Sequence, residues 1–433
     1  MTAFIRLGLI LWALVQAFPA GGNATPAPSP RPAAVAGSPL PQRVYIWQRV
    51  WSPALCRSLR AHAGEFATLD VLAAELSFAG AAPAASYAAP DWALLRELGV
   101  PVALVVRVGP CRSTWGPDTA EARLVLAAGA RVLAQARAGG VEPVELQLDY
   151  DSATSRLREY GGLLRQVRTA LAPPRLAITT LPTWLGSADF GALVAGTDTY
   201  VLQVHGLDRP DAPDRPYVLC DPGRAARWIR QAAALGRPFR VALPAYGYRV
   251  AVDLTGQFRG LQAEGRAKAW PLGTTKRAVW ADPPQIARLV GELLAHPPAA
   301  CESLCWFRFP CEDDRLAWRW PTLAEVMNGR EPRADLVMHT CPGEDGALDI
   351  VLENRGTNQA APVPFRVNWR GAKLVAAEGA GGWRCERDGE GRIVLTPPAG
   401  DAAGPVFPGD SVRVGWLRLD ATVVPEAVPV AVP

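Results

Sequence analysis

The sequence predicts a (β/α)8 barrel, also called a TIM barrel, followed by a small all-β domain. Eight strand-like segments alternate with helix-like segments in the middle of the chain, and this alternation is typical of a parallel sheet. They occupy about 270 residues, which is the size of a closed barrel. After residue 330 the pattern changes to short strands without helices. The chain has 433 residues, enough for two or three domains.

The eight strands are expected in order along the first of these domains, residues 43–330. They are expected at residues 43–51, within 66–79, and at 101–109, 143–151, 175–181, 199–205, 238–245 and 303–310. Helices are expected at residues 91–99, 119–138, 156–171, 223–235 and 284–295. The alternative is an open doubly wound sheet, which usually carries a glycine-rich phosphate turn after an early strand. The sequence has neither a GxGxxG nor a Walker pattern, so we favour the barrel.

Residues 331–433 predict an accessory domain with an extended C-terminal tail. Short strands are expected at residues 335–339, 347–354, 363–369, 393–396 and 411–419. Pro, Gly and Asn separate these strands, which is typical of an all-β sandwich. The stretch DIVLENRG resembles immunoglobulin-like accessory domains of secreted proteins. Such a domain packs, spaces or binds more often than it catalyses.

The first residues predict export. Arg6 precedes an apolar run over residues 7–18, a length that suits a signal peptide and is short for a membrane span. We expect a signal peptide at residues 1–24 and a Pro/Ala-rich linker at residues 25–42. The mature protein would then be periplasmic or secreted, with no membrane span. An uncleaved N-terminal anchor is the alternative.

Composition narrows the range of partners. The net charge is +4 and no polybasic run occurs, so we expect no nucleic-acid partner. Eight cysteines suit an oxidising compartment and predict disulfides plus a few buried thiols. Cys341 and Cys385 both fall in the accessory domain and are a candidate pair. The remaining spacings are not CxxC and lack partnering histidines, so we expect no metal site and no cofactor.

The fourth predicted strand carries the candidate chemistry, because its two faces differ. Side chains on a strand alternate between faces. One face is apolar and would meet the helices: Val144, Leu146, Leu148 and Tyr150. The other face is polar and would point into the barrel: Glu145, Gln147, Asp149 and Asp151. Burying carboxylates is costly unless they are paired. A polar row that rises to the carboxyl-terminal rim therefore indicates a functional site.

Asp151, nearest the rim, is our candidate general acid, and Asp149 is the residue that supports it. Neighbouring carboxylates repel, so one is pushed towards the protonated form that an acid catalyst needs. The alternative is that Asp151 caps the next helix with Ser152 and Thr154, while Asp149 pairs with an arginine. That alternative leaves Glu145 and Gln147 unexplained.

Other strand ends add polar and aromatic side chains to the same rim. Aromatic faces suit stacking on the C–H faces of sugar rings, although core packing is the commoner role of any one tryptophan. Together with Glu145 and Gln147, the candidate substrate-binding residues are Gln203, His205, Tyr246, Tyr248, Trp47, Trp184, Trp306 and Arg308.

Three of these features resemble chitinase-like glycoside hydrolases of family eighteen. They are the Gln147-x-Asp149-x-Asp151 row, the turn LPAYGY and Trp306. The resemblance implies a barrel and a sugar ligand, with the proton donor at Asp151, where that family has Glu. His205 stands where the family has Tyr. The blocks YIWQRVW, LQLDYDSAT, LPTW and LQVHGL are more similar still to an uncharacterised bacterial family, domain of unknown function DUF3142, over about residues 44–327.

The leading hypothesis is an exported glycoside-hydrolase-like protein that acts on or binds a polysaccharide or oligosaccharide. As a glycosidase it would use Asp151 as the acid and Asp149 as support. The alternative is a non-catalytic carbohydrate-binding or envelope scaffold protein. A metal-dependent deacetylase using Asp149, Asp151 and His205 is a third reading, disfavoured because no HxxxH pattern occurs.

Overall fold

The structure is a computed structural model. It describes residues 40–80, 82–208, 216–263, 270, 272–389, 391–399 and 404–430. The predicted signal peptide and most of the predicted linker, residues 1–39, lie outside the described residues. No helix in the described ranges has both the length and the apolar character that a membrane crossing needs.

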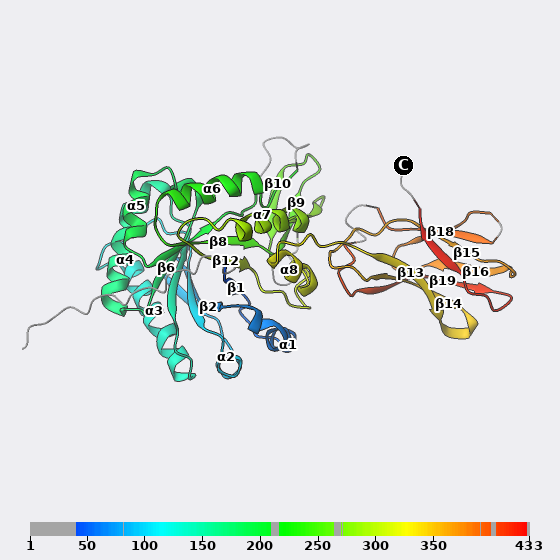
Figure 1. Ribbon diagram of the computed structural model, residues 1–433, viewed down its shortest axis with the longest axis horizontal. Helices are drawn as coiled ribbons and strands as arrows, with labels where there is room; N and C mark the ends of the chain where they lie inside the picture. Colours follow the sequence, from blue (N-terminus) through cyan, green and yellow to red (C-terminus); the bar gives the residue numbers. More distant parts are fainter. Residues whose placement is uncertain are drawn as a thin grey trace, which may run out of the picture. The chain divides into compact units, whose positions relative to one another are not determined.

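Eight parallel strands form a closed barrel (Figure 1). They are β1 (Gln42–Ile46), β2 (Thr68–Ser77), β4 (Val102–Val108), β5 (Glu145–Tyr150), β6 (Leu176–Thr180), β7 (Thr199–Gln203), β8 (Phe239–Pro244) and β12 (Cys301–Phe307). The first strand, β1, pairs with β2 on one side and with β12 on the other, which closes the sheet. The prediction of a barrel rather than an open sheet is confirmed.

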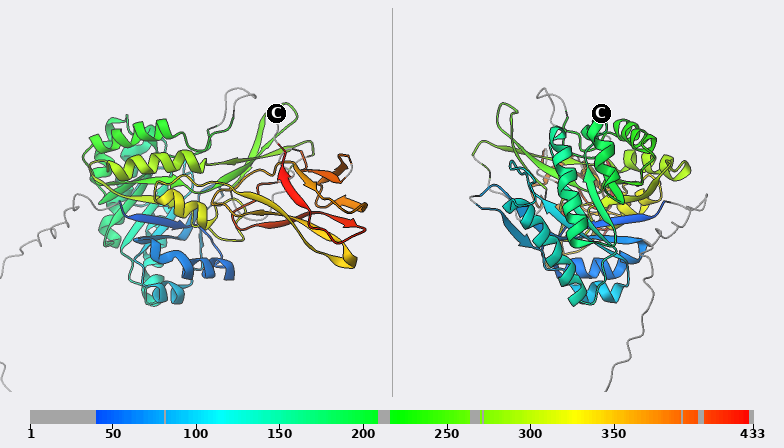
Figure 2. Two further views of the ribbon diagram at one scale, coloured as in Figure 1. Left: turned by 45° about the vertical axis from the view of Figure 1, so that its right-hand side comes forward. Right: turned by 90° about the vertical axis from the view of Figure 1, so that its left-hand side faces the viewer.

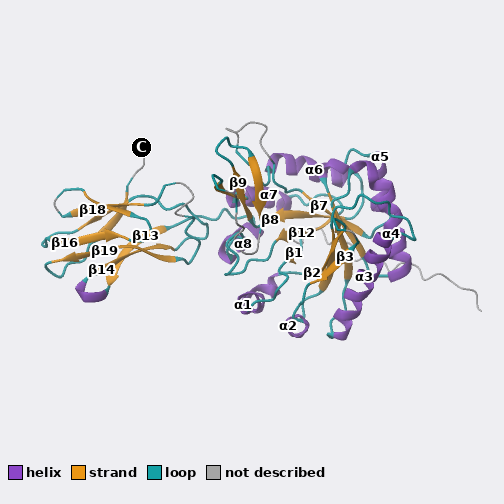
Figure 3. Ribbon diagram, turned by 180° about the vertical axis from the view of Figure 1, so that it is seen from behind, coloured by secondary structure: helices purple, strands orange, loops and turns teal. Residues whose placement is uncertain are grey.

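A helix follows each barrel strand before the next one, and the helices lie outside the strands (Figure 3). They are α1 (Pro53–His62), α2 (Trp92–Leu98), α3 (Ala120–Ala138), α4 (Leu157–Leu171), α5 (Ala188–Ala195), α6 (Pro222–Ala234), α7 (Pro283–Ala295) and α8 (Trp320–Met327). Sequence analysis missed α1, α5 and α8, which are the shorter helices apart from α2. The shortest predicted helix, α2, was recognisable from its ends: Asp91 caps its first turn and Gly99 ends it in a left-handed conformation.

Two additions to the barrel were not predicted. The short strand β3 (Ala84–Tyr87) pairs antiparallel with the end of β2. Between β8 and α7 the chain forms a three-stranded antiparallel sheet from β9 (Gly247–Val252), β10 (Phe258–Gln262) and β11 (Thr275–Trp280). This inserted sheet is drawn in green in Figure 1 and Figure 2. It matters for function because Tyr248 of β9 and Ala263 after β10 reach the barrel mouth.

The barrel interior contains a charged network near the amino-terminal end of its strands. Arg43, Asp70, Glu145 and Arg240, from β1, β2, β5 and β8, are all buried and form one ion-pair network. The interior also contains an apolar cluster that includes Leu72, Val105, Val201, Ala242 and Cys305. Two arginines and two acids balance in charge, so the network compensates much of the cost of burying each group.

After α8 the chain forms two antiparallel four-stranded sheets. Their orders are β13-β14-β19-β16 and β17-β18-β15-β20. The strands are β13 (Leu336–Pro342), β14 (Leu348–Asn354), β15 (Phe365–Asn368), β16 (Leu374–Gly379), β17 (Arg384–Arg387), β18 (Arg392–Thr396), β19 (Ser411–Leu419) and β20 (Glu426–Pro429). Both sheets contribute to one hydrophobic core, for example through Ile350 and Ile393. Strand β20 lies in the region expected to be an extended tail. An immunoglobulin-like arrangement of these strands stays a prediction.

The cysteines differ from the expectation. All eight lie in the described part of the chain and are free thiols. Cys341 is on β13 and Cys385 is on β17, which belong to different sheets, and they do not pair. The prediction of disulfides is therefore wrong for this structure. Most of these thiols are instead small apolar packing groups, such as Cys305 inside the barrel.

Candidate functional site

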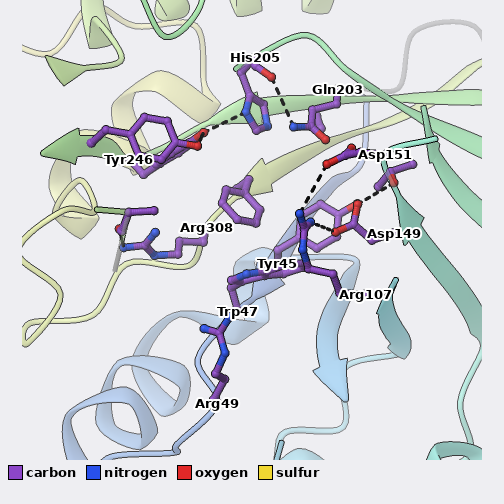
Figure 4. A pocket seen from close by; sticks show the side chains of 15 residues that line it. Tyr45, Trp47, Arg49, Arg107, Asp149, Asp151, Gln203, His205, Tyr246 and Arg308 are labelled. Carbon is purple, nitrogen blue, oxygen red and sulfur yellow. Dashed lines mark hydrogen bonds and ion pairs between the residues drawn. The ribbon is translucent and has the colours of Figure 1, made fainter. Parts of the chain in front are cut away.

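A pocket of about 280 Å³ opens where the barrel strands end (Figure 4). Its lining residues come from the carboxyl ends of β1, β4, β5, β6, β7, β8 and β12 and from the inserted sheet: Tyr45, Trp47, Arg49, Arg107, Asp149, Asp151, Thr179, Gln203, His205, Ala242, Tyr246, Tyr248, Ala263, Phe307 and Arg308. We call this the barrel pocket. It lies where (β/α)8 enzymes carry their active sites.

Arg107 lies between the two carboxylates of the barrel pocket. Its guanidinium donates from Nη1 to Asp149, and its Nη2 lies 3.5 Å from Oδ2 of Asp151. Asp149 is buried and also accepts a hydrogen bond of 2.6 Å from Thr179 Oγ1. The Asp151 side chain is 46% exposed, so its carboxyl group is open to a ligand. Asp149 is thus held in place, whereas Asp151 is the accessible acid.

The environment of Asp151 raises the pKa of its carboxyl group. Desolvation raises the pKa of Asp151, the charge of Asp149 raises it further, and Arg107 opposes both effects. The pKa of Arg107 is raised in turn, chiefly by the charge of Asp149. A carboxyl group that keeps its proton above the usual pH range is suited to act as a proton donor.

His205 and two tyrosines form the opposite wall. Nδ1 of His205 lies 3.3 Å from the Tyr246 hydroxyl, which donates to the Tyr248 hydroxyl at 3.0 Å. The imidazole stacks on Phe307 with 5.7 Å between ring centres. Burial lowers the pKa of His205 to about 3, so the ring is neutral at ordinary pH. His205 therefore offers a hydrogen bond but no positive charge.

Arg308 joins β12 to the inserted sheet and is 1% exposed. Its Nε donates to Asp314 at 2.7 Å and its Nη2 donates to the Ala263 carbonyl at 3.0 Å. Its Nη1 is buried and has no hydrogen-bond partner among the described residues. Aromatic rings of Tyr45, Trp47 and Phe307 pack against one another with centres 5.0–6.0 Å apart. The pocket thus combines polar walls with an aromatic surface.

Most of the predicted site residues meet here. Those that line the barrel pocket are Asp149, Asp151, Trp47, Gln203, His205, Tyr246, Tyr248 and Arg308. The predicted alternation of β5 is confirmed, because Asp149 faces the interior while Leu146 and Leu148 pack in the core outside the barrel. The alternative was that Asp151 caps the next helix while Asp149 pairs with an arginine. Asp149 does pair with an arginine, but no side chain caps the 3-10 turn at Thr154–Arg156 or helix α4.

Glu145 and Gln147 lie too deep to bind a ligand, which corrects their prediction. Glu145 belongs to the buried network and accepts bonds of 2.7 and 2.6 Å from the two Nη atoms of Arg240. Gln147 is also buried, and its Nε2 donates to the Tyr45 hydroxyl at 2.7 Å. Both point inward as expected, but neither lines the pocket. Glu145 therefore takes part in the buried ion-pair network, and Gln147 positions Tyr45, which does line the pocket.

Trp184 and Trp306 are also corrected, because both are fully buried away from the pocket. The Trp184 indole donates to the Ser152 carbonyl at 3.1 Å and packs beside Phe190. Trp306 points out of the barrel, where it contacts Trp318 and donates to Gln42 Oε1 at 2.7 Å. The inward aromatic residue of β12 is its neighbour Phe307.

Sequence reasoning missed several lining residues: Tyr45, Arg49, Arg107, Thr179, Ala242, Ala263 and Phe307. Arg107 could have been found, since it is the one charged residue in the apolar strand PVALVVRVG and shares a face with Val105. Tyr45 alternates with Trp47 in YIW and was equally visible. Ala263 carried no signal, because the sheet that delivers it was not anticipated.

No group of three or more His, Cys, Asp and Glu side chains within the described ranges is placed to hold a metal ion. Asp149 and Asp151 are bridged by Arg107, whose positive charge occupies the space between them. This arrangement does not provide the ligand set that the deacetylase hypothesis requires.

Part of the barrel is similar to a family of known proteins. Residues 99–312 match the family model described as domain of unknown function (DUF3142). No curated protein matches the chain. A similar solved structure is a chitinase from Chromobacterium violaceum, with TM-score 0.46 and 13% identity over 67% of this chain and 98% of that one. Another is the spore cortex-lytic enzyme SleL from Bacillus cereus, with TM-score 0.45 and 12% identity over 67% and 74%.

Proposed function

We propose that the barrel pocket binds a glycan and that Asp151 protonates the oxygen of a glycosidic bond. The observation that carries this proposal is the accessible Asp151 carboxyl, whose pKa is raised by desolvation and by Asp149. A protonated carboxyl at the mouth of the pocket can donate to a leaving oxygen, as glycosidic cleavage requires. Asp149 would stabilise the positive charge that develops on the sugar ring as the bond breaks. A water molecule would then add to the anomeric carbon and give its proton to the Asp151 carboxylate, which restores the acid.

The charges around the pocket favour an uncharged ligand. We count the charged side chains that line the pocket, apart from Asp151, together with their ion-pair partners among the described residues. There are three carboxylates and three guanidinium groups: Asp149, Glu75 and Asp314, and Arg49, Arg107 and Arg308. With Asp151 protonated these charges balance. A neutral sugar would then meet both hydrogen-bonding groups and an aromatic surface without opposing a net charge.

A second function, glycan binding without cleavage, is favoured by one observation. Arg107 contacts both carboxylates, and its positive charge lowers the pKa of Asp151 against the other two effects. If this effect prevails in solution, Asp151 is ionised and cannot donate a proton. The pocket would then be an envelope or scaffold receptor for the same class of sugar.

The experiment compares the wild type with Asp151→Asn on a panel of polysaccharides, measuring reducing ends released and polymer bound. Asn preserves the shape of the side chain but has no acidic proton. We expect Asp151→Asn to lose about 10²–10⁴-fold in rate while binding persists. Asp118→Asn, at an exposed position outside the pocket, is the control. Binding by both proteins with cleavage by neither supports the receptor instead, and absence of binding to every polymer rejects both proposals.

We also propose that the protein is exported, on the basis of the Arg6 and apolar 7–18 pattern. A fusion of residues 1–42 to a reporter enzyme that is active only outside the cytoplasm tests this proposal. Activity of the fusion, lost when a charged residue interrupts the apolar run, is the expected result. An inactive fusion would contradict export.

A further inference from the structure

One face of the β13-β14-β19-β16 sheet carries a partly exposed tryptophan. Ile350 and Leu352 of β14 are fully buried, so Asp349, one position away, points to the opposite face. Trp416 of β19 is the cross-strand partner of Asp349, and Glu378 of β16 is the partner of Trp416. Because cross-strand partners share a face, this indole and the two carboxylates form one row on the outer face.

The row borders a hollow of about 410 Å³, which we call the outer hollow. It is lined by Glu344, Asp345, Ala347, Asp349, Arg413, Trp416 and Arg418. Arg413 Nε donates to Asp349 Oδ1 at 2.7 Å, which fixes one edge. Arg418 Nε is buried and has no partner among the described residues. An unpaired buried donor is unfavourable in the free protein, and a ligand oxygen could satisfy it.

The chemistry of the outer hollow selects a ligand class. Three carboxylates and two guanidinium groups surround the indole, so neither sign of charge dominates and a highly charged polymer is disfavoured. Among the described residues no three metal-ligating side chains are placed to hold a metal ion, and this includes the carboxylates of the outer hollow. What remains is a dense set of donors and acceptors around an aromatic face. Sugar rings present the complementary surface, with C–H groups on one face and hydroxyls at the edges.

We propose that the outer hollow is a second glycan-binding site, with Trp416 as its stacking surface and Asp349, Arg413 and Arg418 as hydrogen-bonding partners of sugar hydroxyls. The ligand is an uncharged oligosaccharide. The site goes beyond the function proposed for the barrel pocket and does not depend on it, since it uses none of the same residues. A chain with both sites would hold a polymer by two contacts, which raises its overall affinity.

The test uses the full chain labelled with 5-fluorotryptophan and followed by fluorine NMR. The sequence has 15 tryptophans, and the signals of Trp416 and Trp47 are assigned by their loss in Trp416→Phe and Trp47→Phe. The probes are oligosaccharides of β-1,4-linked glucose, β-1,4-linked N-acetylglucosamine and β-1,4-linked mannose. We expect the Trp416 signal to shift with at least one probe. If it shifts with none, the outer hollow is not a glycan site and the proposal is overturned.

The Trp47 signal separates this proposal from the proposed function of the barrel pocket. A shift of Trp416 alone supports the outer hollow and not the barrel pocket, whereas a shift of Trp47 alone does the reverse. For the probe that shifts Trp416, Trp416→Ala should weaken binding about tenfold. Val412→Ala is the matched control, because Val412 is 42% exposed on the same strand but does not line the hollow. Equal affinities of the two variants would overturn the proposal.

Discussion

Arg107 holds Asp149 and Asp151 through one side chain: Nη1 donates to Asp149, while Nη2 lies 3.5 Å from Asp151. Its guanidinium carbon also lies 5.9 Å from the centre of the Trp47 ring. One residue therefore contacts the buried acid, the accessible acid and the aromatic surface of the barrel pocket. A ligand that reaches Asp151 therefore also lies close to the positive charge of Arg107.

Replacing Arg107 with Met should raise the pKa of Asp151. Arg107 is the cation that opposes the effects of desolvation and of Asp149, so its loss should move the Asp151 titration to higher pH. If Asp151 is the acid catalyst, the fall in kcat/KM at high pH shifts upward by the same amount. Carbon NMR of the Asp151 carboxyl measures the titration without requiring activity. Arg112→Met, at an exposed site, is the control, and an unchanged titration would contradict the assignment.

Glu145 should be needed for stability rather than for ligand binding. Glu145→Gln removes the charge that compensates Arg240 and Arg43, and both arginines stay buried. We expect the free energy of unfolding to fall by about 3–5 kcal/mol, measured by urea denaturation at pH 7. Glu142→Gln, whose partner Arg137 is exposed, should change it by less than about 1 kcal/mol. A similar small change in both variants would mean that the buried network contributes little.

Glu145 and Asp149 show how much of the site could be predicted from the sequence. The period of two along a strand predicted that Glu145 and Asp149 face the barrel interior, and the structure confirms it. Depth was not predictable from β5 alone, because it depends on how neighbouring strands are staggered. Glu145 is at the first inward position of its strand, opposite Arg43 and Arg240, which come from distant parts of the chain. Glu145 can be recognised as part of a buried ion-pair network only when the positions of both arginines are known.

The aromatic residues illustrate a different limit. On β12 the neighbours Trp306 and Phe307 are both large and apolar, so hydropathy does not tell which one faces inward. The pairing of β12 with β1 and β8 decides it, and Phe307 reaches the pocket. Arg107 is the opposite case: a lone charge in an apolar strand is visible in the sequence, and its inward face follows from alternation.

The free cysteines predict that reducing agents have no effect on stability. Burial raises the pKa values of Cys220, Cys301, Cys305 and Cys311 to about 12, so these thiols are poor nucleophiles and oxidise slowly. Ellman's reagent in denaturant, without reductant, should titrate all eight thiols. Dithiothreitol should leave the Tm unchanged. A count below eight together with a Tm lowered by dithiothreitol would reveal a disulfide that the structure lacks.

His205 should make the protein less stable as the pH falls below about 6.5. Its folded pKa is lowered to about 3, so the native ring stays neutral while the unfolded chain gains a proton. The stability contribution is present above the unfolded pKa and is lost progressively between pH 6.5 and 3. At pH 5 this one group should remove about 2 kcal/mol relative to pH 7.5. His205→Asn should reduce the difference in free energy of unfolding between these two pH values by that amount. The same substitution at the exposed His296 should not. An identical pH dependence in wild type and His205→Asn would contradict the prediction, because it would show that the ring gains its proton over the same pH range in the folded and the unfolded protein.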